Sequence, residues 1–365
     1  MIRFTWLRFR TQALIALGAL AIVAVVLGLT WFHMADVYTT TVAGCHRYND
    51  CAAVLQAFPP APDRTILGLM GDLLIAVPGL IGIFWGAPLV AREFETGTFR
   101  LAWTQGISRN RWLAAKLGLV GAFSLIVAGL LSLMMTWWSG PFDQAYQIRI
   151  TPTVFHETGV VPVGYAAFAF ALGVAAGMII RRTLPAMAVT LVIFAAVQFA
   201  VPFWVRPHLI PPVTTTSALN LGSVVEWGAT NAGRGNGGDL FILTQPDVPG
   251  AWLFSNEVIT QAGRPVSTEP GTQACGGGAS TMQSCRAYLA TLHLRQVLSY
   301  QPASRYWALQ WYETAGYLAL ALLLSGLCFL RIQRGRRAGG DDRGGPGQPA
   351  LLQNWRRPAS SHQSV

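Results

Sequence analysis

Residues 84–117 read FWGAPLVAREFETGTFRLAWTQGISRNRWLAAKL and are the most polar piece of an otherwise apolar half of the chain. The stretch joins two long apolar runs, and its charged side chains are Arg92, Glu93, Glu95, Arg100, Arg109, Arg111 and Lys116. A short basic loop between two membrane spans is expected on the cytoplasmic face of the membrane. The stretch therefore predicts a polytopic membrane protein with a cytoplasmic loop at residues 92–112.

The composition supports this class. Apolar residues make up 52% of the 365 residues and charged residues only 12%, and the mean hydropathy is +0.41. A soluble protein would carry roughly a quarter of charged residues. The net charge of +10 would also suit a nucleic-acid partner, but the basic residues gather beside the apolar runs. We therefore expect a lipid bilayer and no nucleic acid.

Six apolar runs are each about long enough for a membrane-spanning helix, which needs ~20 residues. They cover residues 12–32, 66–91, 113–138, 161–180, 184–204 and 311–331. The predicted fold class is an all-α polytopic membrane protein with six transmembrane helices. The first run could instead be a cleaved signal peptide, but it is longer than a signal's usual apolar region. The alternation of Arg and aromatic residues in 1–11 fits either an interfacial helix or an ordinary basic flank.

Small residues recur at four-residue spacing in two of the runs. Gly82-x-x-x-Gly86 lies in the second run, and Gly173-x-x-x-Gly177 lies in the fourth. Such pairs permit close approach of membrane helices, although glycines are common in apolar spans. Gln198, inside the fifth run, predicts a hydrogen bond between helices.

The remaining segments differ in composition. Residues 205–310 are rich in Gly, Pro, Thr, Asn and Ser and predict an extracytoplasmic insert of roughly 100 residues between the fifth and sixth helices. The basic, Gly/Pro-rich tail at 332–365 is expected to be disordered in the cytoplasm. The domains are thus helices one to five in 1–204, the insert in 205–310, helix six in 311–331, and the tail.

Charge sets the expected orientation. Six spans place both termini on one side of the membrane. That side receives three basic residues before the first run, five in 92–116, Arg181 and Arg182, and seven from Arg331 onward, against four acids. The positive-inside rule therefore predicts that both termini are cytoplasmic.

Four cysteines fall on the predicted outer side, namely Cys45, Cys51, Cys275 and Cys285. An oxidising compartment favours disulfides. The local pairings are Cys45–Cys51 and Cys275–Cys285, but four cysteines allow three connectivities, and free thiols remain an alternative.

The chain lacks the motifs of common catalytic and nucleotide sites. Its only lysine, Lys116, belongs to no Gly-rich phosphate loop, and neither H-E-x-x-H nor G-x-S-x-G occurs. We therefore expect no enzyme activity, no metal and no cofactor in this chain. Asp72 and Glu313 lie near the ends of spans, where water could solvate them. The pair His156-Glu157 is expected at the surface.

Local rules give the central loop a helix–turn–helix form. Gly97 can end the second span, and Thr98 can cap a short helix over residues 99–105. Phe99 and Trp103 would share one face of that helix. Arg100 and Gln105 would face away, and Ser108 could cap the third span. The aromatic face could dock on a soluble partner or rest on lipid headgroups.

The run GAPLVAREFETGTFRLAWTQGISRNRWLAAKL resembles the region after the second span in type-2 ABC export permeases of actinobacteria. In that family a Glu-x-Glu-x-Gly-Thr element precedes a coupling helix that docks on the ATPase subunit. Residues 300–324 (YQPASRYWALQWYETAGYLALALLL) are similar to the start of the family's last span, and MIRFTWLRFRTQAL to its N-terminus. The resemblance is weak in 205–299, which is longer than the outer hairpin of many exporters.

The resemblance implies a permease subunit of an ATP-driven exporter in the bacterial plasma membrane, with an amphipathic or hydrophobic substrate. A separate cytoplasmic ATPase subunit would bind the ATP, and a second copy of the chain or a related permease would complete the pathway. The coupling loop that it implies comprises Glu93, Glu95, Gly97, Thr98, Phe99, Arg100, Trp103, Gln105 and Arg109.

Three other functions stay open at this point. The chain could be a membrane sensor or accessory protein whose outer domain binds a ligand. It could be a hydrolase acting through His156 or His293. An ion-coupled transporter would need buried acids in mid-span, and the sequence shows none there.

Overall fold

The computed structural model describes residues 2–43, 57–59, 61–98, 108–229, 240–246, 248–266 and 282–341. Six helices within these ranges are long and apolar enough to cross a membrane. They are Phe9–Val42, Asp63–Glu95, Arg109–Trp138, Val161–Ile180, Thr183–Leu209 and Ala303–Arg334. Every run predicted from the sequence is therefore helical, and each matches or exceeds its predicted length.

The first span consists of α1 (Ile2–Val37) and a π-helical turn, Tyr38–Val42. No break separates residues 2–11 from the span, so the predicted interfacial segment is the beginning of α1. The helix packs along α6 (Arg109–Trp138), where the rings of Trp31 and Trp137 stack with centroids 4.7 Å apart.

The second span has three parts, α3 (Ala61–Leu80), a π-helical turn (Ile81–Gly86) and α4 (Ala87–Glu95). Proline lacks a backbone N–H and interrupts the helical hydrogen-bond series. The wider turn ends at Gly86, two residues before Pro88, and the helix continues past the missing bond as α4.

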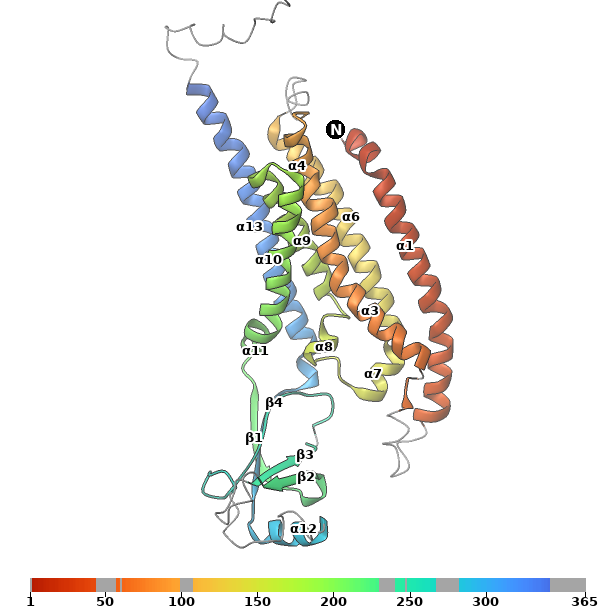
Figure 1. Ribbon diagram of the computed structural model, residues 1–365, viewed down its shortest axis with the longest axis vertical. Helices are drawn as coiled ribbons and strands as arrows, with labels where there is room; N and C mark the ends of the chain where they lie inside the picture. The colour runs from red at the N-terminus through yellow and green to blue at the C-terminus, as the bar shows by residue number, and fades with distance from the viewer. Residues whose placement is uncertain are drawn as a thin grey trace, which may run out of the picture.

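Helix α9 (Val161–Ile180) lies at the centre of the bundle, with α3, α4, α6, α10 and α13 around it (Figure 1). Most of its residues are buried. A helix that is apolar on all sides is expected in such a place. The sequence alone did not distinguish this span from its neighbours.

The two glycine motifs predicted from spacing face each other. A Cβ on Gly173 would lie against the carbonyl oxygen of Gly82 and 2.7 Å from the backbone nitrogen of Ala87. A Cβ on Gly86 would lie 2.6 Å from the carbonyl oxygen of Phe170. Only glycine therefore permits this approach of α9 to the second span.

The fifth span contains α10 (Thr183–Ala200), a π-helical turn (Val201–Val205) and α11 (Arg206–Leu209), and ends five residues beyond its predicted limit at 204. The last helix, α13, covers Tyr306–Asp341. Residues 332–341 are thus helical rather than disordered, and 342–365 lie outside the described residues. Two short helices, α7 (Gly140–Tyr146) and α8 (Pro152–Phe155), occupy the link before α9.

The insert contains strands, so the chain is mostly helical rather than all-α. The elements are β1 (Val213–Ala218), β2 (Val224–Ala229), β3 (Leu240–Thr244), β4 (Trp252–Ile259), α12 (Met282–Thr291) and β5 (Arg295–Gln301). An antiparallel sheet has the order β1-β5-β4, and β2 pairs with β3. β-branched runs such as VTTTSA favour strands. The overall composition of the insert, rich in Gly, Pro, Thr, Asn and Ser, did not indicate them.

The sheet joins the bundle through the pairing of β1 with β5. β1 follows α11 and β5 precedes α13, and these strands pair from Val213↔Tyr300 to Ala218↔Arg295. The side chain of Gln301 donates to the carbonyl of Ile210, and Arg305 donates to the carbonyl of Pro211 at 2.6 Å. The insert is thus attached through a two-stranded ribbon.

The bundle has two dissimilar ends (Figure 1). The start of α1, the end of α4, the link between α9 and α10 and the end of α13 lie together, and we call this the loop end. The strands, α7 and α8 lie at the opposite end, the insert end. The segments that charge assigned to one face of the membrane therefore share one end of the bundle.

Candidate functional site

The loop end carries the Glu-x-Glu-x-Gly-Thr element. α4 ends at Glu95, and Gly97 has a φ of 71°, in the left-handed region that glycine adopts without strain. The chain is described again at Ser108, whose hydroxyl accepts a hydrogen bond from the backbone N–H of Arg111. The predicted helix break at Gly97 and the predicted cap at Ser108 are both confirmed.

Glu93 is held inside the bundle. Its carboxylate forms an ion pair with Lys116 of α6 at 2.6 Å, and both side chains are largely buried. The Lys116 ammonium also donates to the carbonyl of Leu89 at 3.0 Å and lies 4.5 Å from the centre of the Trp112 ring. The only lysine of the chain therefore joins the second span to the third.

Glu95 reaches the fifth span. It accepts hydrogen bonds from the hydroxyl of Thr183 at 2.6 Å and from the backbone N–H of Thr183 at 3.1 Å. Thr183 is the first residue of α10. An acid at this position satisfies a free N–H group and complements the positive end of the helix dipole.

The structure thus places five predicted coupling residues at one junction. Glu93 and Glu95 bind α6 and α10 within the chain, Gly97 and Thr98 lead out of α4, and Arg109 begins α6. Phe99, Arg100, Trp103 and Gln105 lie outside the described residues, as do Cys45, Cys51 and Cys275. Cys285 belongs to α12, but its side chain is not among those described.

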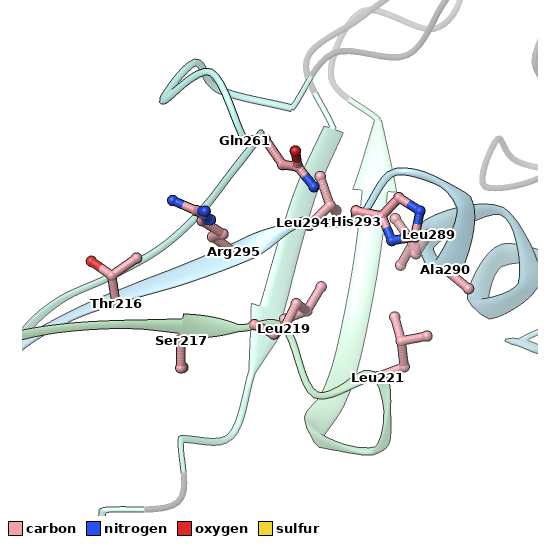
Figure 2. Close-up of a pocket in the computed structure, with 11 residues that line it drawn as sticks. Thr216, Ser217, Leu219, Leu221, Gln261, Leu289, Ala290, His293, Leu294 and Arg295 are labelled. Carbon is pink, nitrogen blue, oxygen red and sulfur yellow. The ribbon is translucent and has the colours of Figure 1, made fainter.

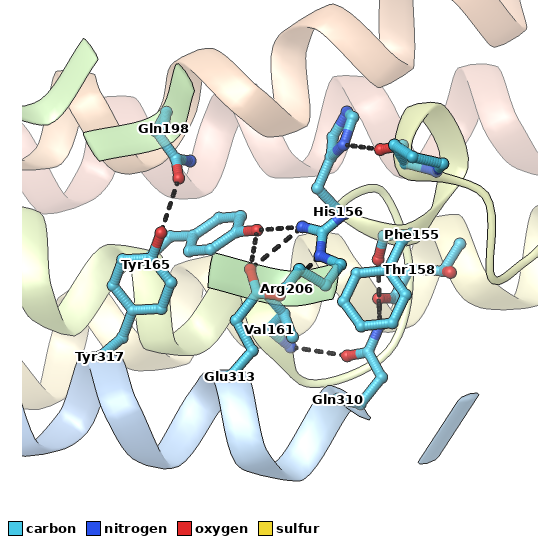
Figure 3. A network of polar contacts seen from close by, with 11 residues as sticks. Phe155, His156, Thr158, Val161, Tyr165, Gln198, Arg206, Gln310, Glu313 and Tyr317 are labelled. Carbon is cyan, nitrogen blue, oxygen red and sulfur yellow. Dashed lines mark hydrogen bonds and ion pairs between the residues drawn. The ribbon is translucent and has the colours of Figure 1, made fainter. Parts of the chain in front are cut away.

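A buried polar cluster lies at the insert end (Figure 3). The guanidinium of Arg206 donates to both oxygens of Glu313, at 2.7 and 3.1 Å, and the two side chains are 0% and 2% exposed. The Tyr165 hydroxyl donates to Glu313 at 2.8 Å, and the guanidinium lies 4.2 Å above the centre of the Phe155 ring. This pair joins the end of the fifth span to the sixth.

Gln310 extends the same cluster toward the link before α9. Its side-chain oxygen accepts from the backbone N–H groups of Val160 and Val161, both at 3.0 Å. Its amide donates to the carbonyls of Phe155 and Thr158. Four backbone groups between the end of α8 and the start of α9 thereby gain a hydrogen-bond partner.

Two expectations about polar side chains in spans meet different outcomes. Gln198 accepts a hydrogen bond from the Tyr317 hydroxyl at 3.2 Å, which confirms its predicted role between helices. Glu313 was expected to be solvated and is buried instead. Its partner Arg206 lies 107 residues earlier, so no local pattern indicated the pair.

His156 and Glu157, expected at the surface, are mostly covered. Burial and the carboxylates of Asp72 and Asp143 raise the pKa of Glu157 to about 7, while burial lowers the pKa of His156. Their closest nitrogen and oxygen are 3.9 Å apart. No group of three or more potential metal ligands occurs in the described ranges.

The insert holds a cavity of about 710 Å³ (Figure 2). Its lining combines leucines with the polar side chains of Gln261, His293 and Arg295. His293 has a φ of 45°, which is uncommon for a residue other than glycine. Cavities of this size suit small ligands in general.

Six apolar spans, four of them arranged around the glycine- and alanine-rich α9, define a multi-pass membrane protein. Residues 17–206 match the family model described as "ABC-2 membrane transporter related", and the chain belongs to that family. No curated protein and no solved structure matches this chain. ABC-2 membrane domains are transport components that in general act as dimers with an ATPase.

Proposed function

We propose that this chain is the permease subunit of an ATP-driven exporter, moving an amphipathic or hydrophobic substrate out of a bacterial cell across the plasma membrane. ATP would be bound by a separate ATPase subunit that docks on residues 92–112. A second copy of the chain, or a related permease, would form the other half of the pathway.

The geometry of Glu93 and Glu95 carries this proposal. A loop that transmits force must be fixed to the helices that it moves. Glu93 binds Lys116 in the third span and Glu95 binds Thr183 in the fifth, while both belong to the second. A push on the loop would therefore act on three spans together.

The proposed cycle follows from these connections. Closure of the ATPase pair on ATP displaces the loop, and the second, third and fifth spans tilt as a unit. The opening at the loop end narrows, and the substrate leaves at the insert end. Phe99 and Trp103 would be the apolar contacts with the ATPase.

Deletion of residues 99–105 tests the docking. We expect the variant to insert in the membrane and to lose the co-purifying ATPase. A control deletion of residues 231–237, in the insert, should keep the ATPase. Normal ATPase binding by the first variant would contradict the assignment of the loop.

The orientation requires its own test. We propose that the loop end and both termini face the cytoplasm, since the basic residues gather there. In a chain whose native cysteines are replaced by serine, Thr104→Cys should resist a membrane-impermeant maleimide in intact cells, and Thr214→Cys should react. Labelling of Thr104→Cys in intact cells would overturn the proposed direction of coupling.

The insert cavity favours a second candidate, a membrane sensor or accessory protein that binds a ligand without transporting it. Under this candidate, His293→Ala and Arg295→Ala would abolish ligand-induced signalling. Neither the wild-type chain nor these variants would export a substrate from vesicles. ATP-dependent export by the wild-type chain with its ATPase would exclude this candidate.

A further inference from the structure

A continuous groove runs along one side of the bundle, between α1 and the second and third spans. Its polar part, of about 470 Å³, lies at the loop end and is lined by Gln12, Arg92, Glu93 and Lys116, among others. Its apolar part, of about 220 Å³, continues toward the middle of the bundle. Phe84 and Trp85 line both parts, so the two are contiguous.

We propose that this groove binds one anionic phospholipid of the surrounding bilayer, with the headgroup beside Arg92 and an acyl chain between α1 and α3. The polar end of the site shares Arg92, Glu93 and Thr98 with the proposed docking loop, and lipid binding goes beyond the transport function.

The headgroup part has the charge that such a lipid requires. Its lining contains two cations, Arg92 and Lys116, and one acid, Glu93. Glu93 and Lys116 neutralise each other as an ion pair, which leaves Arg92 as the net positive charge. The amide of Gln12 adds hydrogen-bond donors. Basic pockets between membrane helices are known to select anionic headgroups.

The tail part has the chemistry and the depth of one leaflet. Its lining is entirely apolar, from Ala16, Ala19, Leu20 and Val23 on α1 to Val127 and Leu131 on α6. Val120 lines the headgroup part and Leu131 the tail part. The two residues are eleven positions apart along α6, which corresponds to about 16 Å along the helix axis at ~1.5 Å per residue. This distance matches half of the ~30 Å hydrocarbon core.

Packing explains why the groove stays open. Phe9, Trp85 and Phe123 form an aromatic cluster with ring centroids 5.3 to 5.5 Å apart, which braces α1 against its neighbours beside the groove. In the apolar part of the groove, α1 contributes the small residues Ala16 and Ala19. Small side chains there leave room for an acyl chain.

Native mass spectrometry of the full-length protein tests the site, after exchange into micelles with equal amounts of phosphatidylglycerol and phosphatidylcholine. We expect one retained phosphatidylglycerol per chain. Arg92→Gln should reduce its retention roughly fivefold, and Arg92→Lys should restore most of it. The control Arg111→Gln removes an exposed arginine outside the groove and should have no effect.

A second pair of variants tests the tail. Ala19→Phe fills the apolar part and should reduce retention as strongly as Arg92→Gln. Ala21→Phe places the same ring on α1 outside the groove and should leave retention unchanged. Size-exclusion profiles verify that each variant is folded.

Three results would overturn the proposal. One is equal retention of the two lipids by the wild-type chain, and another is no loss with Arg92→Gln. The third is a loss with Arg92→Gln but none with Ala19→Phe, since a free phosphate would need no tail groove. None of these measurements depends on an ATPase.

Discussion

The two ends of the bundle hold their helices together with the same kind of interaction in different surroundings. At the insert end, Arg206 and Glu313 are almost completely withdrawn from solvent, at 0% and 2% exposure. At the loop end, Lys116 and Glu93 are 7% and 14% exposed, and Glu95 is exposed. Buried ion pairs are costly to break, whereas exposed ones exchange readily with water. The Arg206–Glu313 pair and the Glu93–Lys116 pair are therefore expected to stay assembled, whereas the exposed contact of Glu95 with Thr183 at the loop end can change.

The largest expected effect comes from breaking the buried pair. Glu313→Ala leaves the Arg206 guanidinium buried without its carboxylate, and we expect a loss of about 3–5 kcal/mol in stability, measured by thermal unfolding in detergent micelles. The double variant Arg206→Met with Glu313→Leu should recover most of the loss, because no charge stays buried. Equal instability of the single and double variants would remove the contrast between the two ends.

The second-largest loss of stability is expected from disturbing the close packing of α9 against the second span, between the two ends of the bundle. Gly173→Ala sets a methyl group against backbone atoms of the second span, which cannot rotate away. We expect a loss of about 1–3 kcal/mol in the same unfolding assay. Gly118→Ala is the matched control, because no atom lies within 4 Å of its new Cβ. An unaffected Gly173→Ala variant would show that α9 can shift relative to the second span.

At the insert end, Glu157 should also make the stability of the protein depend on pH. The pKa of Glu157 is raised to about 7 in the folded chain, from an ordinary value of 4.5. The folded state therefore favours the protonated carboxyl, and stability should fall as the pH rises from about 4.5 to about 7. We expect the fall to be on the order of 1–2 kcal/mol, reduced by partial solvation.

Glu157→Gln should remove this part of the pH dependence. The difference between the two unfolding curves isolates Glu157 from His156 and Asp143, which titrate in both proteins. Parallel curves for wild type and variant would show that Glu157 has the same pKa in both states.

The smallest effect on stability is expected at the loop end. Glu95→Gln weakens an exposed contact with Thr183, so the unfolding temperature should stay close to that of wild type. Under the proposed function, ATP-driven transport should nevertheless decline severalfold, since the loop loses its connection to α10. Glu257→Gln, exposed in β4, is the control. Equal transport by both variants would contradict a coupling role for Glu95.

Much of the fold could be predicted because each span carries its own signal. Apolar length located all six helices, and glycine spacing indicated close helix approach at each motif, although not that Gly82 and Gly173 would face each other. The cap at Ser108 and the break at Gly97 followed from local rules. Such features depend on residues within a few positions of one another, which a single sequence displays directly.

The remaining features depend on partners that are distant in sequence. Glu313 was taken for a solvated residue because it lies near the start of the sixth span. Its partner Arg206 was placed outside the fifth span, which extends to Leu209. Glu93 and Glu95 were read as contacts for another protein, whereas their described partners are Lys116 and Thr183. Their contact with an ATPase is part of the proposed function.

The ribbon formed by β1 and β5 makes the insert a replaceable module. Ala218 and Arg295 lie opposite each other, so a tight turn could join them and the polypeptide between them could be exchanged. The membrane helices would keep their connection throughout. Related chains could thus acquire very different appendages on an unaltered helical bundle, and experimenters could fit a reporter there by the same route.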